Sequence, residues 1–152
     1  MTDFKFRLET LLRLRIAERD QRRADLAKAL RAEEMLRAED QALSQKQAGA
    51  AEESRRLKSP GAADVDALLQ THRFELALTT QRRTLAAQIA QVQAEAERRR
   101  LTLVEADRQV RVLEKLRERQ ADAHRRETER LDVKQFDELA TQAFVRRQEA
   151  HA

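Results

Sequence analysis

The scarcity of residues that interrupt a helix constrains this chain more than any other feature. Its 152 residues include one proline and two glycines, and the proline and one glycine are adjacent in Ser59-Pro60-Gly61. Proline disfavours the helical conformation of the residue before it, and glycine accepts a positive φ without steric cost. Nearly every other position favours a helix, so the sequence predicts two long helices on either side of one break.

The composition argues against most other architectures. Aromatic residues make up 3% of the chain and cysteine is absent. Sheets are rich in β-branched and aromatic residues, and disulfides or cysteine-ligated metals require thiols. The hydrophobic fraction is 41% and alanine is its commonest member, which favours narrow helical seams over a broad core. Disorder is the competing interpretation, but a net charge of only +4 favours helices.

The predicted fold class is all-α, a long two-helix antiparallel coiled-coil hairpin in which the second helix overhangs the first. A short connection between two long helices favours the antiparallel arrangement. We expect a single coiled-coil domain over 1–152, with helices over 4–58 and 64–148 and a turn over 59–63. Asp64 is expected to cap the second helix.

Alternating steps of three and four residues trace a heptad seam along the second helix. Ten of its fourteen positions are apolar, whereas a random arrangement would give about six. The fourteen positions are Leu68, Thr71, Glu75, Leu78, Arg82, Leu85, Ile89, Val92, Ala96, Arg99, Leu103, Ala106, Val110 and Leu113. Such a seam indicates packing against another helix. The first helix is less regular, because Glu18 to Arg23 interrupts its apolar residues, and we expect stutters or a locally unwound supercoil in this helix.

The second helix is longer than its partner. With a turn near residue 60, residue i faces roughly residue 120 − i. The first helix therefore ends opposite residue 116, and the second helix has no partner beyond that point. We therefore expect 117–148 to project beyond the hairpin. Apolar residues return there with helical spacing at Phe136, Leu139 and Phe144. This face suggests docking to another protein; a helix that folds back and a frayed tail are the alternatives.

The sequence shows no sign of catalysis. It contains no catalytic triad order, glycine-rich phosphate loop or zinc motif, so we expect no enzyme activity, cofactor, metal or small-molecule substrate. Basic runs such as Arg98-Arg99-Arg100 stand among acidic residues at helical spacing. Intrahelical pairing explains these runs without a nucleic-acid partner. Charged residues also interrupt every apolar stretch, so we expect a cytoplasmic protein without a secretory signal or membrane span.

The amino-terminal segment from Phe4 to Arg15 is amphipathic and basic. It could bind a membrane surface, but packing against residues 106–117 of the second helix is the more economical explanation.

Three segments resemble the flagellar export proteins of the FliJ family. The opening F-x-F-R-L-E-x-L-L-x-L-R, from Phe4 to Arg15, resembles the start of that family. The later segments Leu113 to Gln120 and Lys134 to Ala140 resemble its carboxyl-terminal pattern. The resemblance covers essentially the whole chain. It implies a non-enzymatic component of the bacterial flagellar type III export apparatus, similar to the stalk of a rotary ATPase γ subunit.

The resemblance also implies partners. They are the hexameric flagellar export ATPase, which the stalk binds and activates, the cytoplasmic part of the membrane export gate protein, and export chaperones that it escorts. The implied location is cytoplasmic, peripheral to the inner membrane at the flagellar base. The residues expected to contact the ATPase ring are Phe4, Phe6, Leu8, Leu131, Phe136, Leu139 and Phe144. Those expected to contact the gate are Leu68, Thr71, Phe74 and Leu78.

Two other functions fit the same architecture. One is the equivalent stalk of a virulence type III secretion system, which neighbouring genes would distinguish. The other is a coiled-coil scaffold or basic nucleic-acid adaptor without an ATPase partner. Phosphate-driven binding weakens steeply with salt, so salt dependence would identify the adaptor.

Overall fold

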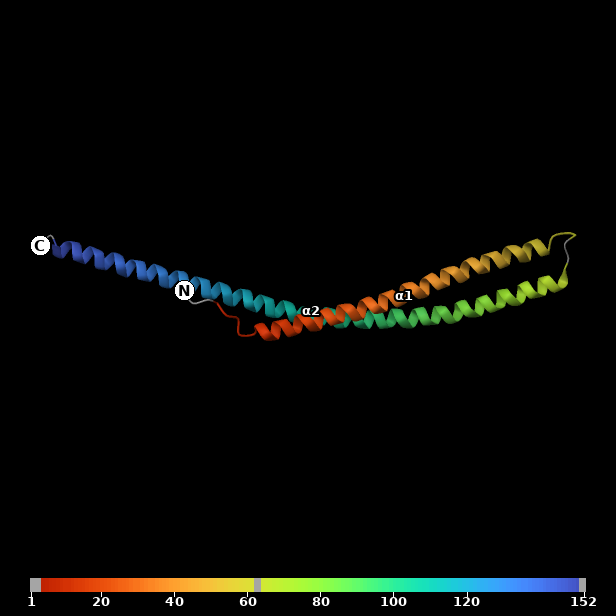
Figure 1. Ribbon diagram of the computed structural model, residues 1–152, viewed down its shortest axis with the longest axis horizontal. Coiled ribbons are helices and arrows are strands. Elements are labelled where there is room, and N and C mark those ends of the chain that lie inside the picture. Colours follow the sequence, from red (N-terminus) through yellow and green to blue (C-terminus); the bar gives the residue numbers. More distant parts are fainter. Residues whose placement is uncertain (1–3, 62–63, 151–152) are drawn as a thin grey trace. The chain divides into compact units, whose positions relative to one another are not determined.

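A computed structural model of the protein describes residues 4–61 and 64–150. These residues form two helices, α1 (Glu9–Leu57) and α2 (Val65–Ala150), and no strand lies among them. Figure 1 shows that the chain runs toward the connection along α1 and back from it along α2. The predicted all-α coiled-coil hairpin is therefore confirmed.

Helix α1 begins at Glu9, five residues later than the expected start at residue 4. Residues 4–6 have no regular structure, and the Glu9 amide donates to the Phe6 carbonyl at 3.2 Å. In a helix, side chains two residues apart point about 200° apart. The non-helical entry lets Phe4 and Phe6 both reach the same packed cluster, which a helical start would not.

The break between the helices follows local chemistry. Gly61 adopts a φ of 93°, the only positive φ among the described residues. The carboxylate Oδ1 of Asp64 accepts from the amides of Asp66 and Ala67 at 3.0 and 3.2 Å, so the predicted cap is confirmed. Residues 62 and 63 of the predicted turn over 59–63 lie outside the described part of the chain.

The chain divides into two compact units, where we expected one domain. The terminal unit combines Met1–Arg19 with Ala106–Ala152, and the turn unit is Asp20–Glu105. Both helices contribute to each unit. In the turn unit, α1 and α2 lie side by side and antiparallel (Figure 1).

All fourteen predicted seam positions of α2 are buried or half-buried. This includes polar members such as Glu75 and Arg82, so the heptad spacing predicts burial even where the residue type does not. Small residues share the seam, because Ala96 is as buried as Leu85. The seam is therefore narrow and only partly apolar.

The stutters expected in α1 are absent between Leu26 and Leu57. Ten of the fifteen buried or half-buried positions there follow steps of three and four without interruption. The ten positions are Leu26, Ala29, Glu33, Leu36, Asp40, Leu43, Gln47, Ala50, Ser54 and Leu57. Four of them are polar and two are alanine, so an apolar pattern did not reveal the regular seam.

Polar seam residues pair across the helices of the turn unit. The Arg82 guanidinium donates to both Asp40 oxygens, at 2.9 and 3.3 Å, and to the Gln47 oxygen at 2.9 Å. Gln47 donates to the Thr79 hydroxyl at 3.2 Å. Arg99 donates to the backbone carbonyl of Asp25 at 2.6 Å. Residue i thus faces about residue 125 − i, a shift of about five residues from the expected pairing.

Candidate interaction surfaces

The terminal unit has a small apolar core. Phe6, Leu12 and Val110 are buried, and Leu12 and Val110 are the most fully enclosed side chains described. The partly buried residues around them are Phe4, Ile16, Leu113 and Leu116. This core holds the amino-terminal segment against α2. The structure thus confirms the prediction that the amino-terminal segment packs against the second helix.

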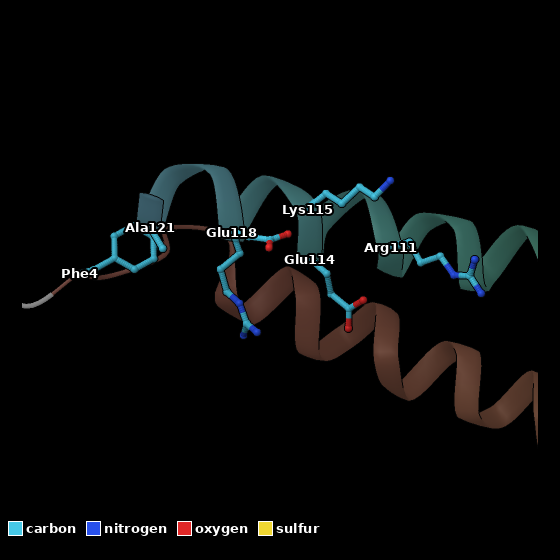
Figure 2. Close-up of a pocket in the computed structure, with 7 residues that line it drawn as sticks. Phe4, Arg111, Glu114, Lys115, Glu118 and Ala121 are labelled. Carbon is cyan, nitrogen blue, oxygen red and sulfur yellow. The ribbon is translucent and has the colours of Figure 1, made fainter. Parts of the chain in front are cut away.

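A groove of about 590 Å³ lies beside this core (Figure 2). Its lining residues are Phe4, Arg111, Glu114, Lys115, Arg117, Glu118 and Ala121. Figure 2 shows the Phe4 ring next to Ala121, while Lys115 points away from α1. Arg117 reaches Glu9 of α1 at 3.6 Å. The groove combines an aromatic ring with charges of both signs.

The covered part of α2 extends past residue 117, where we expected the projection to begin. The rings of Phe4 and His124 lie 5.8 Å apart at a tilt of 52°. The expected boundary assumed that the first helix starts at residue 4 and that residue i faces residue 120 − i. The observed pairing, with residue 125 − i, moves the boundary toward the carboxyl-terminal end of α2. From residue 133 to residue 149, every residue of α2 is exposed.

The predicted ATPase-contact residues of α2 are all exposed; three of them lie within 133–149, and Leu131 lies just before that stretch. Leu131 is 48% exposed and Phe136 70%, and Leu139 and Phe144 are both 61% exposed. We define the C-terminal stripe as Phe136, Leu139, Ala140, Ala143 and Phe144. Val133 and Val145 are exposed nearby and were not predicted. Val145 stands on the opposite side of α2, whereas Val133 lies on the side of the C-terminal stripe, three residues before Phe136, so its spacing was a signal that the prediction did not use.

The C-terminal stripe continues the side of α2 that the amino-terminal segment covers. His124 and Thr128 are half-buried, and so is Asp132 four residues later. A further step of four reaches Phe136, and a step of three reaches Leu139. At 100° per residue these positions share one side of the helix. The same side is therefore packed at its start and uncovered at its end.

The three predicted amino-terminal contact residues differ in exposure. Phe6 is 8% exposed and belongs to the core, so its folded role is packing. Phe4 is half-buried at the groove, and Leu8 is 37% exposed. The structure brings Phe4 near His124 but leaves both well before Phe136 along α2.

The predicted gate residues divide in a similar way within the turn unit. Leu68 and Thr71 are half-buried, and Leu78 is 3% exposed, so these three belong to the seam. Phe74 is 50% exposed and is the one accessible member of the set. Exposed Val65, Leu69 and Leu76 were not predicted. Their spacing of four and seven residues was a signal, but they lie off the seam that guided the prediction.

Arginines of the basic runs pair largely within their own helices, as predicted. Glu95 contacts both Arg98 and Arg99, at 3.4 and 2.8 Å, and Glu97 contacts Arg100 at 3.7 Å. Similar pairs at spacings of three or four join Arg37 to Glu33, Arg55 to Glu52, Arg56 to Glu53, Arg125 to Asp122 and Arg130 to Glu127. These contacts pair part of the positive charge of the runs with carboxylates of the same helix.

Shifted pKa values occur in the seam of the turn unit. Hydrogen bonds from Gln93 and then Arg37 lower the pKa of Glu33. The Arg82 hydrogen bond lowers the pKa of Asp40, and the same contact raises the pKa of Arg82. All three groups pair across or along the helices, so the shifts reflect structural pairing.

The described residues present neither a metal-binding cluster nor a membrane-spanning stretch. No cluster of three potential ligands among them could hold a metal ion. Within the same residues, neither helix offers a stretch both long and apolar enough for a membrane span.

Comparison with known proteins identifies a family. A family model described as "Flagellar FliJ protein" matches residues 4–149, nearly the whole chain. No curated protein and no solved structure matches the chain.

Proposed function

The chain belongs to the flagellar FliJ protein family, and from that premise we propose that it is the stalk that binds and activates the hexameric flagellar export ATPase. Family membership makes it a component of the flagellar type III export apparatus. The family is a non-catalytic one, so the function lies in contacts with partners.

The observation that supports the stalk role is the uncovered C-terminal stripe. An α-helix with its side chains is about 10–12 Å across, so a single helix can enter the central hole of a ring that excludes a globular domain. Exposed apolar side chains on such a helix gain free energy when a partner buries them. Phe136, Leu139 and Phe144 are the proposed anchors, and Leu131 is a further proposed contact on another side of α2.

The amino-terminal segment has a supporting role in this proposal. Phe6 anchors the segment in the core of the terminal unit. Phe4 and Leu8 are then held where they can contact the rim of the ring. Charged groups of the groove, such as Lys115 and Glu118, would form solvent-exposed rim contacts, which add specificity more than affinity.

The ATP hydrolysis rate of the same organism's export ATPase tests the proposal. The full chain should stimulate the hydrolysis rate. A chain truncated after Arg130 keeps the contact between Phe4 and His124 but loses the C-terminal stripe, and it should not stimulate. The double variant Phe136→Ala/Leu139→Ala should reduce stimulation at least about tenfold, because two buried anchors are lost.

Met35→Ala is the matched control. Met35 is 73% exposed on α1 in the turn unit, so its truncation should leave stimulation unchanged. The ring-contact proposal is contradicted if the truncated chain stimulates as well as the full chain. An ATPase that forms hexamers but ignores the full chain would favour a scaffold.

Contact with the cytoplasmic part of the export gate protein is the second part of the proposal. Phe74 is the proposed anchor, because the other three predicted residues face the seam. Phe74→Ala should weaken gate binding in a titration, whereas Leu69→Ala, which removes an equally exposed residue, should not. Equal losses would assign the contact elsewhere. The proposal also includes the escort of export chaperones and a position at the flagellar base.

A further inference from the structure

A second row of residues on α2 is exposed in the turn unit, and one of its members, Thr79, accepts a hydrogen bond from Gln47 of α1 at 3.2 Å. Its largest members are Leu76, Leu101 and Val104, which are 55%, 63% and 60% exposed. We define the outer row as the nine exposed residues Leu76, Thr79, Arg83, Ala86, Ala90, Ala94, Glu97, Leu101 and Val104. None of them belongs to the heptad seam or to the proposed ATPase and gate contacts.

The outer row has the spacing of a coiled-coil seam. Successive members are separated by 3, 4, 3, 4, 4, 3, 4 and 3 residues. At 100° per residue the nine positions fall within an arc of about 80° on one side of α2. The row spans just over four heptads, enough to sustain helix pairing. The sequence of steps is the same when it is read from either end, with Ala90 at its centre.

The chemistry of the row is also complementary to itself in the reverse direction. When two copies lie antiparallel about Ala90, residue i faces residue 180 − i of the other copy. Leu76 then faces Val104, and Thr79 faces Leu101. Ala90 faces its own copy, and the alanines on either side allow the two helices to approach closely.

Charge provides an independent argument for this direction. In the antiparallel pair, Arg83 faces Glu97 twice. Within the described chain, Arg83 has no ion pair or side-chain hydrogen bond. The contact of Glu97 with Arg100 is long, at 3.7 Å, and both side chains are well exposed. A parallel pair would instead place Arg83 against Arg83, which is unfavourable.

We infer that the outer row is an interface for a second copy of this chain, formed by antiparallel pairing of residues 76–104 of α2. The apolar pairs stand at the two ends of the interface, and the two Arg83–Glu97 pairs set its register. The charged pairs favour a second copy as the partner, because the copy presents Glu97 opposite Arg83 and Arg83 opposite Glu97 in one antiparallel register. The dimer leaves the C-terminal stripe and Phe74 outside the interface.

Sedimentation equilibrium of the full chain tests the inference by charge exchange. The unaltered chain should form a dimer. Arg83→Glu and Glu97→Arg should each raise the dissociation constant at least about tenfold, because each places like charges together. The double variant Arg83→Glu/Glu97→Arg should restore the dissociation constant to within about threefold, since opposite charges face each other again.

Arg31→Glu, on α1, is the matched control and should leave the dissociation constant unchanged. Circular dichroism of each variant should show unchanged helicity, because every substituted side chain is exposed. A chain that stays monomeric at about 0.5 mM overturns the inference. So does a double variant that fails to restore dimerisation.

Cysteine cross-linking tests the direction, since the chain has no native cysteine. A mixture of Leu76→Cys and Val104→Cys chains should form the mixed disulfide dimer under mild oxidation. Disulfides of each variant with itself would instead indicate a parallel pair and overturn the proposal. Met35→Cys, exposed on α1, should cross-link slowly. ATPase stimulation by these variants is a separate measurement, so the two proposals can fail independently.

Discussion

Individual polar residues set the register of the helices in the turn unit. Arg82 occupies a seam position. An apolar residue there would pack in several registers of the two helices, whereas the Arg82 guanidinium finds hydrogen-bond partners in only one register. It is held by two oxygens of Asp40 and one of Gln47. A half-buried charge without those partners is unfavourable, so displaced registers are disfavoured. Polar seam residues thus contribute specificity where alanine-rich packing cannot.

Replacement of Asp40 should weaken the fold near neutral pH and change its response to acid. The Arg82 hydrogen bond lowers the pKa of Asp40 below its ordinary value of 3.8. A carboxyl with a lowered folded pKa adds stability above its unfolded pKa, and the added stability is lost as the pH falls through the folded value. Asp40→Asn should therefore lower the melting temperature at pH 7 and flatten its decline below about pH 4.

Thermal melts of Asp40→Asn and Glu39→Gln between pH 2 and 7, followed by circular dichroism, provide the check. Glu39 is exposed, with no ion pair or side-chain hydrogen bond in the described chain, so its replacement is the matched control. Identical melting curves for the two variants at every pH would remove the assigned role of Asp40.

At the scale of the elements, the two glycines have opposite effects. Gly49 lies inside α1, where an added Cβ would meet no atom within 4 Å. Gly61 lies in the connection with a φ of 93°, and its space is equally open. The difference between them is therefore conformational. One glycine weakens a helix that continues through it, and the other permits the helices to reverse direction.

Alanine substitutions should separate these effects. Gly49→Ala should raise the free energy of unfolding by about 0.5–1 kcal/mol, because alanine favours the helix and loses less backbone entropy. Gly61→Ala should lower it by about 1 kcal/mol, because the left-handed conformation is strained for alanine. Urea titrations followed by circular dichroism measure both. Stabilisation by both substitutions would show that the connection does not require a positive φ.

At the scale of the whole molecule, cover along α2 is uneven. Packing in the terminal unit is concentrated around Leu12 and Val110, whereas all residues from 133 to 149 are exposed. Tertiary packing supplies most of the stability of helices in proteins, and residues 133–149 of α2 have no such packing. Local opening of α2 should therefore begin at its carboxyl-terminal end.

Hydrogen exchange followed by mass spectrometry should reveal this order. Peptides from residues 133–149 should exchange fastest, and peptides around Val110 slowest, since a core residue opens only with the unit that buries it. Addition of the export ATPase should slow exchange in 133–149 if the C-terminal stripe is its contact. Uniform exchange along α2 would contradict the prediction that the local stability of α2 follows its packing.

Much of the architecture was determined by local sequence. The two helices, the break at Ser59-Pro60-Gly61, the cap at Asp64 and every seam position of α2 could be predicted. These features depend on backbone preferences and on the 3.5-residue repeat, both of which act within a few residues. The accessible positions of the candidate site, such as Phe136, followed from the same spacing.

Only the tertiary structure decided which polar residues are buried, where the first helix begins and how the two helices align. In the sequence, Asp40 and Gln47 resemble surface residues. They lie in the seam because Arg82 of the other helix donates hydrogen bonds to them, and a polar side chain is buried favourably only with such a partner. Phe6 likewise leaves the helical path because a distant residue, Val110, completes its core. Such pairings depend on the partner residue, which no local pattern specifies.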